Sequence, residues 1–173
     1  ARLGDALGSV NTFYPAEPRL DIANFPDELL GRHDFLISSD VFEHIPPAEL
    51  GRAFEDSRKL LRPGGVFIFT LPFLKEGETR EHFPRLHDFR IVEEGGRRVL
   101  KNRTLDGDEE TFDQLLFHGG EGMTLEMRIF TQPDLFRRLR PPRFSSAAVR
   151  IVNSPPVSIP CPLVSPFPLP ALP

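Results

Sequence analysis

The sequence of 173 residues has a single cysteine and no tryptophan, and its only long uncharged stretch is residues 151–173. One cysteine, Cys161, cannot form an internal disulfide, which excludes a disulfide-stabilised scaffold and favours a reducing compartment. The uncharged stretch contains 8 prolines in 23 residues. Because prolines at this density break a helix, the stretch is not a membrane span, and we expect an unstructured tail there.

An excess of positive charge is also lacking. The sequence has 21 Lys and Arg against 25 Asp and Glu, a net charge of −4. This balance argues against nucleic acid or an anionic membrane as a partner. The first ten residues contain no apolar stretch typical of a secretion signal, so we expect the protein in the cytoplasm. The hydrophobic fraction of 39% and the charged fraction of 27% are typical of a globular chain. We expect one domain over residues 1–150.

A strand, a helix and a second strand are predicted between residues 34 and 71. Residues 35–37 and 66–71 are short apolar runs rich in β-branched and aromatic side chains, a composition typical of strands buried on both faces. Between them, Pro47 suits a first helical turn, and apolar residues follow at helical spacing from Leu50 to Leu61. A unit of this length predicts two parallel strands joined by a crossover helix.

The region 75–130 is predicted to be an antiparallel β meander beside the parallel sheet. Residues 97–103 and 111–117 flank Asp106-Gly107, a dipeptide typical of hairpin turns. Residues 123–129 alternate between apolar and polar, which predicts a strand with one wet face. A short helix over 133–139 follows, with Thr131 and Asp134 at capping-box spacing, and residues 147–152 form a last predicted strand.

Ligands of open α/β sheets bind beyond the carboxyl ends of the strands. After the first predicted strand, this rule selects Ser38, Ser39, Asp40, Glu43 and His44. Glu43 and His44 suit an acid–base pair, because histidine titrates near neutral pH and a carboxylate can orient it. The alternative is that Asp40 caps a turn and that Glu43 and His44 belong to a solvated loop.

The same rule selects residues that follow the second predicted strand. Phe73, Arg80 and His82 are the side chains that we expect to bind a substrate there, and a solvated surface loop is the alternative. His82 and His87 are five residues apart with Pro84 between them. This spacing does not fit metal-ligand templates, so we expect no metal site.

Two stretches carry a family resemblance: residues 34–45, DFLISSDVFEHI, and residues 60–72, LLRPGGVFIFTLP. Together they resemble the half of class I S-adenosylmethionine-dependent methyltransferases that contains the fourth and fifth strands, in the branch acting on small molecules. The implied fold is α/β, with a partial Rossmann-like methyltransferase sheet and the β meander as an insertion on the substrate side. By this resemblance S-adenosyl-L-methionine is the cofactor, Asp21 contacts its adenine, and Ser38 and Ser39 lie against its methionine part. Ile22 and Asp40 are further cofactor-binding residues.

The sequence departs from the family at its beginning. The family's first strand ends in a Gly-rich loop against the cofactor, whereas Gly4 and Gly8 do not form a G-x-G pattern here. The 20 residues before Asp21 are too few for two strands and two helices, so we expect the first βαβ unit to be absent and the chain to be truncated.

The resemblance implies methyl transfer to a small-molecule or sugar-like acceptor. The alternative is a non-catalytic remnant of a methyltransferase or a partner-binding module. A third option, another nucleotide-binding α/β enzyme, would need a phosphate loop, and the sequence has none.

Overall fold

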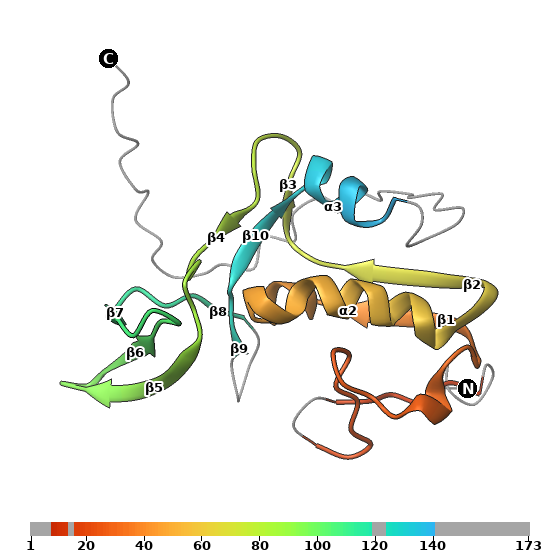
Figure 1. The fold of residues 1–173 in the computed structure, drawn as a ribbon, viewed down its shortest axis with the longest axis horizontal. Coiled ribbons are helices and arrows are strands. Elements are labelled where there is room, and N and C mark those ends of the chain that lie inside the picture. Colours follow the sequence, from red (N-terminus) through yellow and green to blue (C-terminus); the bar gives the residue numbers. More distant parts are fainter. Residues whose placement is uncertain (1–7, 14–15, 119–123, 141–173) are drawn as a thin grey trace.

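The computed structural model describes residues 8–13, 16–118 and 124–140. The predicted strand over 147–152 and the proline-rich tail lie outside the described residues. Figure 1 shows β1, α2 and β2 together on one side and the sheet of β5, β6 and β7 on the other, with β3, β4 and β10 between them. The structure is therefore mixed α/β, with parallel and antiparallel strand pairs.

The predicted βαβ unit is confirmed. Strand β1 spans His33–Ser39, helix α2 spans Pro47–Leu60 and strand β2 spans Leu61–Thr70. β1 and β2 pair in parallel, with a register that runs from Phe35↔Val66 to Ser39↔Thr70. The carboxyl ends of both strands therefore meet at one edge. Helix α2 begins with Pro47 at a position that needs no N–H donor, and it buries a mainly apolar stripe: Leu50, Ala53, Phe54, Ser57 and Leu60. Leu61, which was predicted to continue this stripe, begins β2 instead.

The expectation that these strands are buried on both faces is wrong for the described residues. Ile37, Val66 and Ile68 are 51%, 54% and 51% exposed, whereas the alternate residues Phe67 and Phe69 pack against the core. Successive side chains of a strand point to opposite faces, and α2 lies on one face only. The second face of the parallel pair is apolar and is left open by the described part of the chain.

The antiparallel meander predicted over residues 75–130 is confirmed in part. Strand β5 spans Asp88–Glu94, β6 spans Arg97–Arg103 and β7 spans Glu109–Phe112, and each pairs antiparallel with the next. The predicted turn at Asp106-Gly107 joins β6 to β7; Gly107 has a φ of +89°, which favours glycine. Strand β8, Phe117–His118, pairs with β9, Thr124–Leu125.

The predicted strand over 123–129 is divided between two sheets, because β9 pairs with β8 and β10 pairs elsewhere. Strand β10 spans Arg128–Thr131 and lies between β3, Phe73–Leu74, in parallel and β4, Arg80–Glu81, antiparallel. The prediction that Glu126 and Arg128 line a wet face is wrong, since both are buried. Their charges are compensated by partners distant in sequence, which local alternation does not reveal.

A short helix, α3, spans Gln132–Arg138, close to the predicted range. The predicted capping box is wrong, because Thr131 makes no side-chain capping bond. Thr79 replaces it: its hydroxyl accepts from the Thr131 amide at 3.1 Å and donates to the Asp134 carboxylate at 2.8 Å. This pair of bonds fixes the β3–β4 connection on the first turn of α3.

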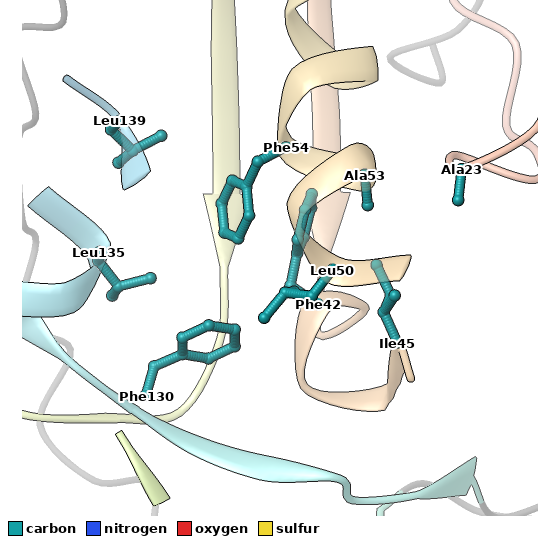
Figure 2. Packing of buried hydrophobic residues seen from close by; sticks show 9 residues of the cluster. All are labelled: Ala23, Phe42, Ile45, Leu50, Ala53, Phe54, Phe130, Leu135 and Leu139. Carbon is teal, nitrogen blue, oxygen red and sulfur yellow. The ribbon is translucent and has the colours of Figure 1, made fainter. Parts of the chain in front are cut away.

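The main hydrophobic core joins α2, α3, β10 and the segment after β1. That segment contains a 3₁₀ turn, η2, over Phe42–His44. Figure 2 shows the nine buried residues: Ala23, Phe42, Ile45, Leu50, Ala53, Phe54, Phe130, Leu135 and Leu139. The ring centroids of Phe42 and Phe54 are 4.4 Å apart, and Phe130 meets Phe54 edge to face at 6.3 Å. The segment that follows β1 is thereby held rigidly against α2 and β10.

A second core cluster lies under the meander and consists of Phe83, Leu86, Leu100, Leu125 and Met127. A further 3₁₀ turn, η1, spans Asp27–Leu29. No helix within the described ranges is long and apolar enough to span a membrane.

Candidate functional site

Three polar side chains gather where β1 and β2 end. Ser39 Oγ and Thr70 Oγ1 lie 3.0 Å apart, and the Thr70 hydroxyl donates to Asp40 Oδ1 at 3.2 Å. The Asp40 amide donates to the Thr70 carbonyl at 3.0 Å, and Asp40 has a φ of +51°. This left-handed conformation is uncommon for a residue other than glycine and turns the chain sharply at the strand end. Ser39, Asp40 and Thr70 are exposed and offer hydroxyl and carboxylate groups to a ligand.

Ser38 and Ser39, which the sequence assigns to the same part of a cofactor, point to opposite faces of β1. Ser38 is buried on the α2 side, and its Oγ has no hydrogen-bond partner among the described residues. Ser39 lies on the open side with Thr70. The two hydroxyls therefore reach different surroundings.

Asp21 lies in a turn before β1. Its Oδ1 accepts a hydrogen bond from the Ala23 amide at 3.0 Å, and Oδ2 makes none within the described part of the chain. Ala23 belongs to the main core and Ile22 packs against it, so the turn is anchored on the same core as η2. Asp21 also lines an open cleft of about 280 Å³, whose other lining residues are Glu17, Arg19, Leu20, Asn24, Phe25 and Pro26. The sequence did not single out these neighbours.

Glu43 is fully buried in η2. Neither of its carboxyl oxygens has a hydrogen-bond partner among the described residues. The pKa of this carboxyl is raised from 4.5 to about 7: burial is the largest cause and the charges of Asp40 and Glu126 add to it, while the residue's own backbone and Arg128 oppose the rise. The alternative of a solvated loop at Glu43 is therefore wrong. A buried carboxyl that titrates near neutral pH is typical of functional sites, although structural clusters also contain them.

His44 is oriented by a backbone carbonyl. Its Nδ1 lies 2.8 Å from the Leu125 carbonyl oxygen, which can only accept, so Nδ1 carries the proton. Its Nε2 lies 3.9 Å from Glu43 Oε1, which is an electrostatic contact without hydrogen-bond geometry. The predicted Glu43–His44 pair is thus adjacent in space. The orientation of its imidazole comes from the β9–β10 segment.

Arg128 joins three elements from a completely buried position in β10. Its Nε donates to Glu81 Oε1 at 2.7 Å, and its Nη1 donates to the Phe42 carbonyl at 2.8 Å. Burial lowers the pKa of the guanidinium, and the bond to Glu81 opposes this effect. The Met127 amide also donates to the Glu43 carbonyl at 2.8 Å. Two consecutive residues, Met127 directly before β10 and Arg128 within it, therefore bond η2 and fix its position against β10.

The residues predicted to bind a substrate lie around β10 without sharing one face, because Phe130 and Ile129, the partners of Phe73 and Arg80, are consecutive and point to opposite faces. Phe73 pairs with Phe130 through β3, Arg80 pairs with Ile129 through β4, and His82 directly follows β4. Phe73 is half-buried against the main core, and Arg80 is exposed. These three residues and the η2 pair therefore belong to elements that contact the same strand and its flank.

Glu126 and Arg128 are the site-forming residues that sequence reasoning missed. Both were expected on a wet strand face, but each is buried and bonds a partner side chain that is about a quarter exposed, His82 for Glu126 and Glu81 for Arg128. The available signal was the presence of two charged residues within an otherwise apolar segment. Within the described ranges, no group of three or more His, Cys, Asp or Glu side chains is arranged to hold a metal ion.

Comparison with known proteins gives a distant likeness of fold to solved structures. No family model matches the chain, and no curated protein matches it. A solved S-adenosylmethionine-dependent methyltransferase from Clostridium acetobutylicum ATCC 824 is similar over 70% of this chain, with 17% sequence identity and a TM-score of 0.36. The matched region spans 50% of that structure. A likeness at this level gives no information on the chemistry of individual residues.

Proposed function

We propose that this protein binds S-adenosyl-L-methionine at the carboxyl edge of β1 and β2 and transfers its methyl group to a small-molecule or sugar-like acceptor. The observation that supports this proposal is the exposed cluster of Ser39, Asp40 and Thr70 at the parallel strand ends. In open α/β sheets this edge is where ligands bind.

The residues at this edge fit the chemistry of the cofactor. Its amino-acid end carries an ammonium group, for which the exposed Asp40 carboxylate is a suitable partner. Its adenine carries an amino group that can donate a hydrogen bond to Asp21 Oδ2, because Oδ2 makes no bond to another described residue. Ile22, packed against the main core, supplies an apolar contact beside Asp21. We therefore assign Asp21, Ile22, Ser39 and Asp40 to cofactor binding, with Ser38 supporting Ser39 from the opposite face.

The acceptor side of the proposed site is formed by Phe73, Arg80 and His82, with Glu43 and His44 across β10. When the cofactor is bound, it supplies an electrophilic methyl group. The protein's own contribution is then to hold the acceptor atom in line with that group and to exclude water, which accelerates transfer chiefly through proximity and orientation. We also propose that the protein works in the cytoplasm without a nucleic-acid or membrane partner, on the evidence of its charge and cysteine content.

Calorimetric titration of the full chain with S-adenosylmethionine tests this proposal. We expect a micromolar dissociation constant for the wild type and at least a tenfold weakening, about 1.4 kcal/mol, for Asp40→Asn and for Asp21→Asn. Asp27→Asn, which changes an exposed carboxylate in η1, is the matched control and should bind as the wild type does. If the wild type shows no binding at about 1 mM cofactor, its binding free energy is weaker than about 4 kcal/mol, and the proposal is contradicted.

A second function, that of a partner-binding module without catalysis, is favoured by the open face of the parallel strands. Ile37, Val66 and Ile68 form an exposed apolar group on that face, and such groups often mark protein interaction sites. The same titration separates the two functions, because a binding module of this kind has no need to retain affinity for the cofactor.

A further inference from the structure

The strongest geometry for proton transfer in the described structure lies at His82 and Glu126. His82 Nε2 is 2.8 Å from Glu126 Oε1. The Glu126 side chain is 5% exposed, whereas that of His82 is 25% exposed. A buried carboxylate therefore holds an imidazole that solvent or a small molecule can reach.

Backbone bonds fix both members of this pair. The His82 amide donates to the Met127 carbonyl, and the Glu126 amide donates to the Leu116 carbonyl, each at 2.8 Å. The His82 ring also meets the buried Phe83 ring edge to face, with centroids 6.2 Å apart. The pair is thus preorganised by its surroundings, as a functional histidine requires.

The bond to Glu126 determines which nitrogen of His82 is basic. An ionised carboxylate only accepts hydrogen bonds, so Nε2 carries the proton and Nδ1 carries the lone pair. Within the described residues, Nδ1 makes no hydrogen bond to the protein. The carboxylate also stabilises the imidazolium that forms when Nδ1 accepts a proton, which is the role of the carboxylate in a catalytic triad.

His44, the histidine selected from the sequence, lacks this arrangement. Its Nδ1 donates to a neutral carbonyl, and its basic Nε2 faces the buried Glu43 at 3.9 Å. Because burial favours the neutral form of Glu43, that carboxyl offers little negative charge to an imidazolium at His44.

We propose that His82 accepts the proton of the methyl acceptor, with Glu126 as its positioning residue. This inference rests on the proposed methyl transfer and identifies the acceptor as a small molecule with a hydroxyl or amine group. The acceptor O–H or N–H bond breaks and its proton goes to His82 Nδ1. The acceptor lone pair forms the new bond to the methyl carbon, and the electrons of the C–S bond go to sulfur, leaving a neutral thioether. The imidazolium then returns its proton to water.

Nitrogen-detected NMR of ¹⁵N-histidine-labelled protein tests the pair independently of activity. With neutral rings, at about pH 9, we expect the Nε2–H tautomer for His82. Glu126→Leu should weaken that preference toward the tautomer ratio of a free histidine side chain, whereas Glu126→Gln should retain it because an amide oxygen still accepts. A His82 ring in the Nδ1–H form in the wild type would overturn the inference. Circular dichroism identifies a variant that has failed to fold. If Glu126→Leu is such a variant, the tautomer of the wild-type His82 ring decides alone.

Turnover with methyl-labelled cofactor and a panel of small phenols, alcohols and amines tests the role in catalysis. We expect His82→Ala to lower kcat about 100-fold or more with unchanged cofactor affinity. His44→Ala should have a much smaller effect, and the exposed His87→Ala is the matched control. Wild-type turnover that His82→Ala leaves intact would overturn this inference alone. Wild-type protein that neither binds nor turns over the cofactor would overturn the proposed function and this inference together.

Discussion

Arg128 Nε donates to Glu81 Oε1 at 2.7 Å from a side chain that is completely buried. The same guanidinium also reaches the Phe42 carbonyl, so one residue ties β10 to β4 and to η2. A charge in this position is tolerated only with its partners, and the loss of Arg128 leaves Glu81, which is 24% exposed, and the Phe42 carbonyl without their donor. The position of η2, and with it that of Glu43 and His44, therefore depends on Arg128.

Arg128→Leu should lower the free energy of unfolding by about 3 kcal/mol, because Glu81 and the Phe42 carbonyl lose their donor. Chemical denaturation measures this change. Arg62→Leu, which removes a cation from the exposed ion pair with Asp34, is the matched control and should cost less than about 1 kcal/mol. Equal effects of the two substitutions would show that the buried pair has no special role.

Glu43 should make the protein less stable as the pH rises through neutrality. The pKa of Glu43 is raised in the folded state to about 7. The protonated carboxyl therefore stabilises the folded protein fully below about pH 4.5, and this stabilisation is lost as the pH rises through 7. The shift in this pKa corresponds to a loss on the order of 3 kcal/mol in the free energy of unfolding across this pH range. Denaturation midpoints at intervals from pH 5 to 8 should decline in the wild type.

Glu43→Gln should remove that decline, since an amide does not titrate. Glu49→Gln, at an exposed position in the first turn of α2, is the control and should keep it. An unchanged pH dependence in Glu43→Gln would show that Glu43 ionises normally in the folded protein.

Asp134 should make the protein less stable as the pH falls, the reverse of the effect of Glu43. Burial opposes ionisation, but hydrogen bonds from Arg138 and Thr79 outweigh it and lower the pKa of Asp134. Its contribution is present above pH 3.8, the ordinary value, and is lost as the pH falls through the lowered one. The difference in stability between wild type and Asp134→Asn, about 1–2 kcal/mol near pH 6, should shrink in acid.

A double-mutant cycle checks the part played by Thr79. Thr79→Val and Asp134→Asn share one hydrogen bond, so their effects on the free energy of unfolding should not add. We expect a coupling energy of about 0.5–1.5 kcal/mol. Strict additivity would mean that the bond between the β3–β4 connection and α3 does not form in solution.

Substitutions on the two faces of the parallel strands should differ sharply. Ile68→Lys, on the open face, should change the free energy of unfolding by less than about 0.5 kcal/mol and reduce the binding of a hydrophobic dye. Phe54→Ala, in the fully buried core, should cost about 3–5 kcal/mol. A large loss of stability in Ile68→Lys would show that this face is covered in solution.

Local patterns predicted the central unit of the fold. The crossover helix follows from apolar spacing between Leu50 and Leu60, and the β6–β7 turn follows from Asp106-Gly107. Both depend on residues that are close in sequence. The parallel pairing of β1 and β2 then follows from the short connection and the handedness of such units.

The parts that sequence reasoning missed depend on partners far along the chain. Arg128 bonds Glu81 and Phe42, which are 47 and 86 residues away, and Glu126 bonds His82 across 44 residues. An alternating pattern placed both charges in solvent because it contains no information on such partners. The location of the site at the strand ends stays a prediction. The carboxylate that orients a histidine was assigned to Glu43, whereas the carboxylate bonded to a histidine in the structure is Glu126.

The central claim, that a ligand binds where β1 and β2 end, is tested most directly by amide NMR of the full chain during titration with S-adenosylmethionine. We predict saturable shifts at Asp21–Ala23, at Ser39–His44 and at Thr70, with little change in the β5–β7 sheet. Absence of shifts, or shifts confined to β5–β7, would contradict the claim.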